Sequence, residues 1–190
     1  MKKLPSVVFI DRDGTIMEDA HYIKEVEQVR LLPGAARALK RINDAKVPVI
    51  VITNQSAIGR GLIALEDYEA VRKKLDSLLE REGAHIDASY FCPDDPRDPR
   101  ASGCRKPATN MFEDAIREHK IEPTRAAYIG DRWRDVAPSR QLGGRGILIY
   151  SPMTTDEDRR KAQEDKYETA PSLQVAVDML FGLTEKDSAP

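Results

Sequence analysis

The sequence predicts an α/β fold in which a doubly wound, mostly parallel sheet carries helices on both faces. Short apolar runs of strand length alternate with segments of helical spacing along the 190 residues, and this alternation is typical of α/β domains with a parallel sheet. The apolar runs lack polar alternation, as expected for strands that are covered on both faces. We expect a single Rossmann-like domain over residues 1–183 and a frayed tail over residues 184–190.

The first predicted strand runs from Val7 to Ile10 and is rich in β-branched and aromatic residues. The segment 17–30 that follows is polar and has no clean period, so we interpret it as a flap over the site. Pro33 is tolerated in the first turn of a helix, and a helix is expected from there to about Ala45. The later strands are expected at residues 48–52, 86–92, 126–130 and 146–150, and the later helices at 65–83, 111–119, 154–166 and 173–180.

The charge balance and the amino terminus argue against several classes of partner. Lys and Arg total 30 against 32 Asp and Glu, a formal net charge of -2, so no overall basic field suggests nucleic acid. The first apolar run stops at Asp11, too soon for a secretory signal or a membrane span. Two cysteines make no disulfide framework and fit a reducing compartment. We expect a cytoplasmic monomer with no nucleic-acid or membrane partner.

Two acids, Asp11 and Asp13, directly follow the first predicted strand. Ligands of open parallel sheets bind beyond the carboxyl ends of the strands, so this position lies in the crevice. If the extended backbone continues, both side chains point to the same side, and their charges repel unless a cation or a shared proton intervenes. Magnesium is the natural cation for such a pair. The alternative is a simple turn, because Asp13-Gly14 is a common turn pair.

Four predicted strands lead into polar residues of different kinds. The acid pair follows the first strand, Thr53-Asn54 ends the second, Arg105-Lys106 follows the loop after the third, and Asp131 follows the fourth, with Asp135 nearby. Carboxylates for a metal, a hydroxyl and backbone amides for phosphate oxygens, and a lysine for the developing charge together suit phosphoryl transfer. An aspartate can also act as the nucleophile in such a reaction.

The chain resembles the haloacid dehalogenase-like phosphatases in four motifs that occur in the family's order, namely DRDGT, a strand ending in TNQ, CRKP and GDRWRD. The resemblance covers residues 7–150. More narrowly, the chain is similar to the subfamily that holds the heptose bisphosphate phosphatases and the histidinol-phosphate phosphatases, through FIDRDGTI, VITNQSAIGRG and CRKP. The resemblance implies a magnesium-dependent phosphomonoester hydrolase that acts on a small phosphorylated metabolite through an aspartyl-phosphate.

The resemblance also implies a role for each matching residue. Asp11 would be the nucleophile, and Asp13 would protonate the leaving oxygen and then activate water. Lys106 would link the phosphate to the nucleophile. The other implied contacts are Thr53 and Asn54 to phosphate, Arg60 and Arg105 to substrate, and Asp11, the Asp13 carbonyl and Asp131 to magnesium, with Asp135 in support.

The intervals between the motifs leave room for the strands and helices of the core but not for an inserted domain. The enzyme is therefore expected to be capless, with access governed by the flap and by the proline-rich loop 93–103. Histidinol phosphate brings an amine and favours acids near the site, whereas a sugar bisphosphate brings a second phosphate and favours cations. Arg60 and Arg105, with Arg132 or Arg134, would supply positive charge. We expect a heptose bisphosphate, with histidinol phosphate as the alternative.

Two other classes of function compete with an enzyme. A phosphate-accepting receiver domain also uses acids, a threonine and a lysine at sheet ends, but its phosphorylated aspartate follows a later strand than its acid pair. A non-catalytic binding protein is disfavoured because all the expected catalytic positions are filled.

The loop before CRKP departs from the subfamily, which commonly holds a structural zinc there through a Cys-x-His pair and a Cys-x-Cys pair. Here the matching pairs are Cys92 with Asp94 and Ser102 with Cys104. Two of the four ligands are changed, and structural zinc sites want four N or S donors. We expect no zinc, thiols that serve as small apolar side chains, and a loop held by its prolines and by hydrogen bonds from Asp94, Asp95 or Asp98.

Overall fold

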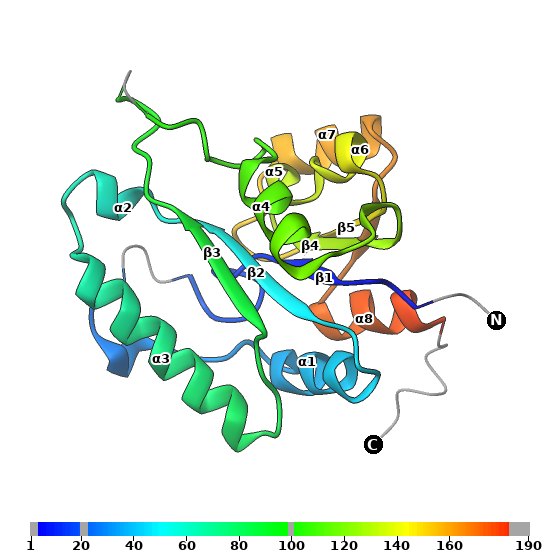
Figure 1. Cartoon of the computed structure of the whole chain (residues 1–190), viewed down its shortest axis with the longest axis horizontal. Coiled ribbons are helices and arrows are strands. Elements are labelled where there is room, and N and C mark those ends of the chain that lie inside the picture. Colours follow the sequence, from blue (N-terminus) through cyan, green and yellow to red (C-terminus); the bar gives the residue numbers. More distant parts are fainter. Residues whose placement is uncertain (1–3, 20–22, 99–100, 183–190) are drawn as a thin grey trace.

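The computed structural model describes residues 4–19, 23–98 and 101–182. Its centre is a six-stranded sheet in the order β3-β2-β1-β4-β5-β6, and every pairing in that sheet is parallel (Figure 1). The predicted doubly wound fold is confirmed. The strands are β1 (Val8–Ile10), β2 (Val49–Asn54), β3 (Ala88–Cys92), β4 (Ala127–Gly130), β5 (Arg145–Ile149) and β6 (Glu168–Ala170).

Helices lie on both sides of the sheet, with α1, α3 and α8 on one side and α4 to α7 on the other (Figure 1). Two short 3-10 helices, η1 and η2, add to them. The helices are α1 (Ala35–Asp44), α2 (Ser56–Gly59), α3 (Leu65–Arg81), α4 (Asn110–His119), α5 (Trp133–Val136), α6 (Ser139–Leu142), α7 (Asp156–Glu164), α8 (Leu173–Phe181), η1 (Val26–Gln28) and η2 (Pro123–Arg125).

The structure differs from the predicted element list in several places, and it also contains the short helices α5, α6, η1 and η2, which the list lacks. β6 was not predicted, because Glu168 and Thr169 are exposed in this edge strand and form no apolar run. α2 is a single turn, too short for helical spacing to be visible in the sequence. The helix expected from Pro33 begins at Ala35 instead, since Gly34 precedes it as N-cap with a left-handed φ of 77°.

The core has one part on each face of the sheet. Val8 and Ile10 of β1 belong to the larger cluster, which includes residues of α1, α3 and α8. Phe9 points to the other face, where it packs with Phe112 of α4 and Tyr128 of β4. β1 is therefore covered on both faces as predicted, and it holds the residues that follow it in a rigid frame.

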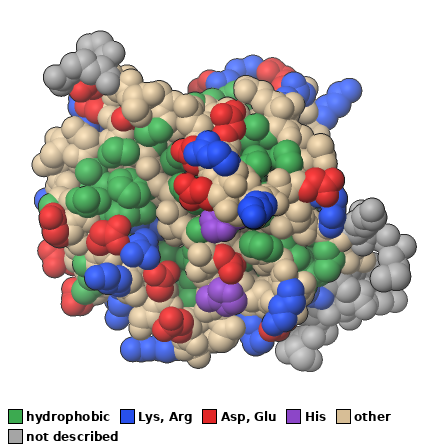
Figure 2. Space-filling view, in the orientation of Figure 1, with side chains coloured by type: hydrophobic (Ala, Val, Ile, Leu, Met, Phe, Trp, Pro, Cys, Tyr) green, Lys and Arg blue, Asp and Glu red, His purple; other side chains and the backbone are tan. Residues whose placement is uncertain are grey.

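The segment predicted as a flap leaves the sheet after β1 and returns beside its own start. Glu18 N donates to Arg30 O at 3.0 Å, and Met17 forms an antiparallel bridge to Leu31. Residues 20–22 of this segment, and the predicted tail 184–190, lie outside the described residues. Within the described ranges, no helix is both long and apolar enough to cross a membrane. Basic and acidic side chains are interspersed on the face drawn in Figure 2.

Candidate active site

The ends of β1, β2 and β4 meet in one pocket. Asp11 N donates to Ile129 O at 2.9 Å, which fixes the backbone after β1 against β4. The pocket is lined by the predicted site residues Asp11, Asp13, Thr53, Asn54, Arg105, Lys106 and Asp131. Side chains far apart in the sequence thus converge because parallel strands all end at the same edge of the sheet.

A buried cation lies against Asp11. Lys106 Nζ donates to Asp11 Oδ1 at 2.7 Å and to Ile52 O at 2.5 Å, and it pairs with Asp135 Oδ1 at 2.8 Å. Burial disfavours the charged ammonium, but Asp11 and Asp135 outweigh burial, so the pKa of Lys106 is raised. Burial, opposed by Lys106, raises the pKa of Asp11 to about 6. Burial alone would favour the protonated form of Asp11. Lys106 opposes that protonation and so favours the carboxylate.

Three buried carboxylates form an acidic cluster beside this lysine. Oxygen atoms of Asp11, Asp131 and Asp135 lie within 4.8 Å of one another. Burial, with the charges of Asp11 and Asp135, raises the pKa of Asp131 to about 7. Magnesium prefers carboxylate oxygens, and a divalent cation would relieve the repulsion that raises these pKa values, so this donor set fits the metal.

Backbone geometry keeps the acidic cluster compact. Gly14 has a φ of +78°, and a Cβ added there would collide with the carboxylate of Asp131. Ser151 Oγ donates to Asp131 Oδ2 at 2.7 Å, and Thr154 Oγ1 donates to the Asp131 carbonyl at 2.8 Å. Asp131 is thus held from the end of β5 as well as from its own strand.

Asp13 lies at the same pocket, but its carboxylate is not part of the acidic cluster. Arg12 Nε donates to Asp13 Oδ1 at 3.1 Å, and Arg12 NH2 to Oδ2 at 3.0 Å. Gln55 Nε2 donates to Asp13 Oδ2 at 2.7 Å and to Thr53 Oγ1 at 2.9 Å. Asp11 and Asp13 therefore have different cationic partners, which are Lys106 for Asp11 and Arg12 for Asp13.

The side chain of Asn54 contacts the backbone of the predicted lysine. Asn54 Oδ1 accepts from Lys106 N at 3.0 Å, and Asn54 Nδ2 donates to Lys106 O at 3.3 Å. Asn54 thus fixes the chain on either side of the Lys106 side chain. Arg60, in contrast, is exposed just after α2 and does not line the pocket.

Two arginines give one part of the pocket a positive charge. Arg105 and Arg134 both line it. Burial and the nearby charge of Arg134 lower the pKa of Arg105. Among the described residues, the buried atoms Arg105 NH1 and Arg134 Nε have no hydrogen-bond partner. Two cationic guanidinium groups that line the same part of a pocket suit an anionic group of a substrate.

Several residues at the site were not assigned a role by the sequence patterns. Arg12 and Gln55 contact Asp13, and Ser151 contacts Asp131. Ser151 follows β5 at the same edge of the sheet, so the rule that pointed to the other strand ends could have found it. Asp19 and Ile23 of the predicted flap also line the pocket.

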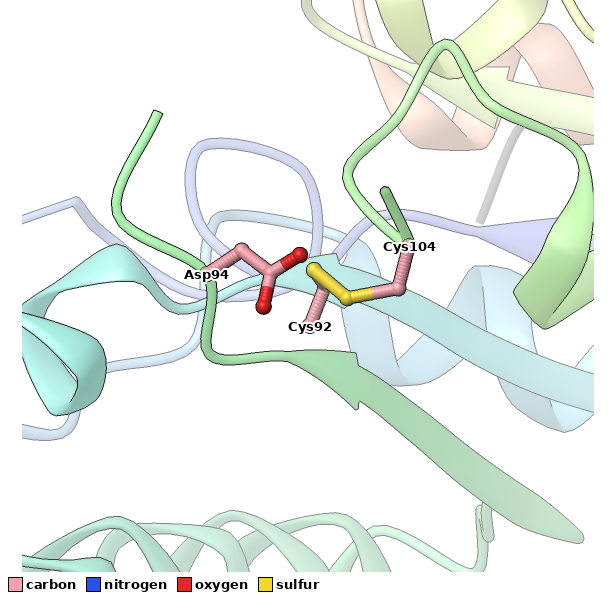
Figure 3. A group of neighbouring side chains, drawn as sticks. All are labelled: Cys92, Asp94 and Cys104. Carbon is pink, nitrogen blue, oxygen red and sulfur yellow. A yellow bond between two sulfur atoms is a disulfide. The ribbon is translucent and has the colours of Figure 1, made fainter. Parts of the chain in front are cut away.

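The prediction for the two thiols is wrong. Cys92, at the end of β3, and Cys104, in the loop before Arg105, form a disulfide with Cα atoms 5.6 Å apart (Figure 3). Their spacing of 12 residues does not by itself predict that they are close, and the loop between them brings them together. The expected hydrogen bonds from Asp94 are present, since its Oδ2 accepts from Ser102 Oγ at 2.8 Å and from Gly103 N at 3.0 Å.

The carboxylate of Asp94 points toward the disulfide, and the three side chains could together surround an ion (Figure 3). Sulfur atoms that are bonded to each other are not thiolates, and zinc is bound by thiolates. The donor set therefore does not fit a structural zinc in the disulfide form. The absence of zinc stays a prediction.

Comparison with known proteins identifies relatives of this chain. The family model of haloacid dehalogenase-like hydrolases matches residues 11–143. A D-glycero-beta-D-manno-heptose-1,7-bisphosphate 7-phosphatase of Haemophilus ducreyi is 32% identical over 162 residues, 82% of this chain and 89% of that protein. A D-glycero-D-manno-heptose-1,7-bisphosphate 7-phosphatase of Thermosynechococcus vestitus is 34% identical over 76% of this chain and 78% of its own.

A solved structure shows the same similarity. The D,D-heptose 1.7-bisphosphate phosphatase of B. bronchiseptica, complexed with magnesium and phosphate, superposes with a TM-score of 0.82 at 26% sequence identity. The superposition covers 93% of this chain and 98% of that one.

Proposed function

Since this chain belongs to the haloacid dehalogenase-like hydrolases, we propose that it is a magnesium-dependent phosphatase that acts through an aspartyl-phosphate on Asp11. The contact between Lys106 and Asp11 carries this proposal. A nucleophilic carboxylate must be ionised and desolvated at the same time. The buried Lys106, at 2.7 Å from Asp11 Oδ1, keeps this buried carboxylate ionised. The proposed roles of Thr53 and Asn54 at the phosphate follow from their place beside this pair.

The reaction has two steps. A carboxylate oxygen of Asp11 attacks phosphorus, and the bond between phosphorus and the leaving oxygen breaks as Asp13 gives that oxygen its proton. Asp13 then takes a proton from water, whose oxygen attacks the same phosphorus and releases Asp11 and inorganic phosphate. Magnesium, held by Asp11 and Asp131 with the Asp13 carbonyl and with Asp135 in support, would neutralise charge on the phosphoryl oxygens.

The proposed substrate is a sugar bisphosphate, preferably a heptose 1,7-bisphosphate. The curated relatives carry that name. Arg105 and Arg134 support it, because two cationic side chains that line the pocket suit a second phosphate better than the amine of histidinol phosphate. Cytoplasmic location and a monomeric state stay predictions.

The substrate is tested by comparing kcat/KM for heptose 1,7-bisphosphate and for histidinol phosphate with magnesium present. We expect the bisphosphate to be preferred. Replacing Arg134 by Gln should reduce that preference by roughly tenfold or more, as expected for one lost charged hydrogen bond, while Arg81→Gln on the exposed end of α3 serves as the matched control. Preference for histidinol phosphate, or an unchanged ratio in Arg134→Gln, would contradict the substrate proposal. The Arg60→Gln variant, assayed in the same way, tests the contact between Arg60 and the substrate that the resemblance implies.

A further inference from the structure

Arg12 stands between the two proposed reacting acids in the sequence, and its buried guanidinium contacts the second of them, Asp13. Arg12 is only 5% exposed, and its planar fork reaches both oxygens of the Asp13 carboxylate. Going beyond the proposed function but resting on it, we propose that Arg12 is a positioning residue: it orients Asp13 for proton transfer, and the ring of Tyr68 holds Arg12 in place.

The ion pair between Arg12 and Asp13 is poorly explained as a structural tie. It joins residues that are already neighbours in the chain, so it links no distant segments. It also buries a guanidinium whose NH1 has no hydrogen-bond partner among the described residues. Burying a charge with an unused donor costs stability, and an apolar side chain would fill the same place at less cost. What the arginine does provide is a fixed direction for both oxygens of Asp13.

Tyr68 of α3 supports the guanidinium from the other side. Arg12 Cζ lies 5.1 Å from the centre of the Tyr68 ring, within the range of a cation–π contact. Tyr68 is 2% exposed, and its ring packs against Phe91 of β3, with the ring centres 4.5 Å apart. The aromatic face is thus fixed by α3 and β3 before Arg12 contacts it. A flexible lysine ammonium could neither stack on this ring nor contact both oxygens in one plane.

Gln55 completes the surroundings of Asp13 without replacing Arg12. Its Nε2 contacts Asp13 Oδ2 and Thr53 Oγ1, so it relates the acid to the proposed phosphate site. Arg12 reaches Oδ1 as well as Oδ2. Contacts to both oxygens fix the rotation of the carboxylate about its last bond, which a single donor to one oxygen does not do.

The test compares substrates with different leaving groups. This comparison distinguishes a loss of Asp13 orientation from a general loss of activity. An alkyl phosphate needs protonation of its leaving oxygen, whereas p-nitrophenyl phosphate releases a stable anion and needs little. For both substrates kcat/KM reports the steps up to the phosphorylated Asp11. General acid catalysis contributes about 100- to 10,000-fold, so Arg12→Lys and Arg12→Met should lower kcat/KM for the alkyl phosphate by roughly 10- to 100-fold. The aryl phosphate should change by less than about threefold.

Further variants assign the effect to named contacts. Tyr68→Leu should change the alkyl-to-aryl ratio of kcat/KM in the same direction as Arg12→Lys, and Tyr68→Phe, which keeps the ring, should restore it. In the Asp13→Asn background, Arg12→Met should leave the ratio unchanged, because the acid that it orients is gone. Thermal unfolding of each variant checks that the fold is retained.

The outcomes that overturn the inference are distinct from failure of the proposed function. An equal loss for both substrates in Arg12→Lys and Arg12→Met would mean a merely structural role. A further change of the ratio on adding Arg12→Met to Asp13→Asn would mean that Arg12 acts elsewhere. Absence of turnover by the wild-type protein on both substrates would remove the proposed function, and this inference with it.

Discussion

Lys106 Nζ donates a hydrogen bond of 2.7 Å to Asp11 Oδ1 in a place where both side chains are buried. Burial raises the pKa of Asp11 to about 6, and Lys106 is the largest influence that opposes it. A pKa near 6 leaves the carboxylate mostly ionised at neutral pH, as a nucleophile requires.

Replacing Lys106 by Met should therefore abolish most of the activity. We expect kcat/KM to fall by about 100- to 1,000-fold, the usual loss when one preorganised electrostatic contact is removed from a reaction centre. The measurement is phosphate release at saturating magnesium, with Lys73→Met on the exposed side of α3 as the control. A loss of only a few-fold in a folded variant would contradict the role given to Lys106.

The acidic cluster predicts a pH-dependent stability in the absence of metal. The pKa of Asp11 is raised to about 6 and that of Asp131 to about 7, chiefly by burial, above the ordinary value of 3.8. The folded protein then binds these protons more tightly than the unfolded chain. Their contribution to the free energy of unfolding is present below pH 3.8 and is lost as the pH rises through 6 and 7.

This dependence is measured by denaturant unfolding in chelator from about pH 4 to about pH 8. Relative to Asp131→Asn, the wild-type protein should lose stability over that range. Magnesium needs ionised carboxylates, so it should raise Tm more at about pH 7.5 than at about pH 5. A magnesium effect that is equal at both pH values, or that persists in Asp131→Asn, would count against this metal site.

The disulfide predicts a stability that depends on redox conditions. Cys92 and Cys104 are 12 residues apart, and closing a loop of about this length stabilises a fold by about 3 kcal/mol in the chain-entropy view. The double variant Cys92→Ala, Cys104→Ser should lose about that much in oxidising buffer. The difference from the wild-type protein should shrink when a reductant is added.

Thiol titration and elemental analysis complete this test. The oxidised protein should show no reactive thiol after unfolding without reductant, and purified protein should hold zinc well below one equivalent. Two free thiols would overturn the disulfide, and stoichiometric zinc in the reduced protein would overturn the expectation of a metal-free loop.

The sequence was sufficient to predict five of the six strands and several residues that follow them at one edge of the sheet. β1 is an apolar run that ends at an acid, and the same pattern at β2 and β4 places Thr53 and Asp131 beside Asp11 without any knowledge of distance. β6 could not be found in this way, because an edge strand exposed at Glu168 and Thr169 carries no apolar signal.

Some contacts between distant segments could not be predicted. The disulfide requires the loop after β3 to return to the end of that strand. The contact between Arg12 and Tyr68 requires α3 to pack beside the first acids, which no local spacing encodes. Arg60 shows the opposite case, since it stands in a matching motif while the structure leaves it exposed outside the pocket.

The central claim is that Asp11 carries the phosphoryl group. The most direct measurement is mass spectrometry of the peptide containing Asp11, taken from Asp13→Asn protein that was quenched after mixing with magnesium and p-nitrophenyl phosphate. In this variant the intermediate should form, because the leaving group needs little protonation, and should persist, because the base that activates water is missing. We predict one added phosphoryl group on Asp11, and none when Asp11→Asn is treated in the same way. Phosphate on a different residue, or turnover by folded Asp11→Asn at a rate near that of the wild-type protein, would contradict the account.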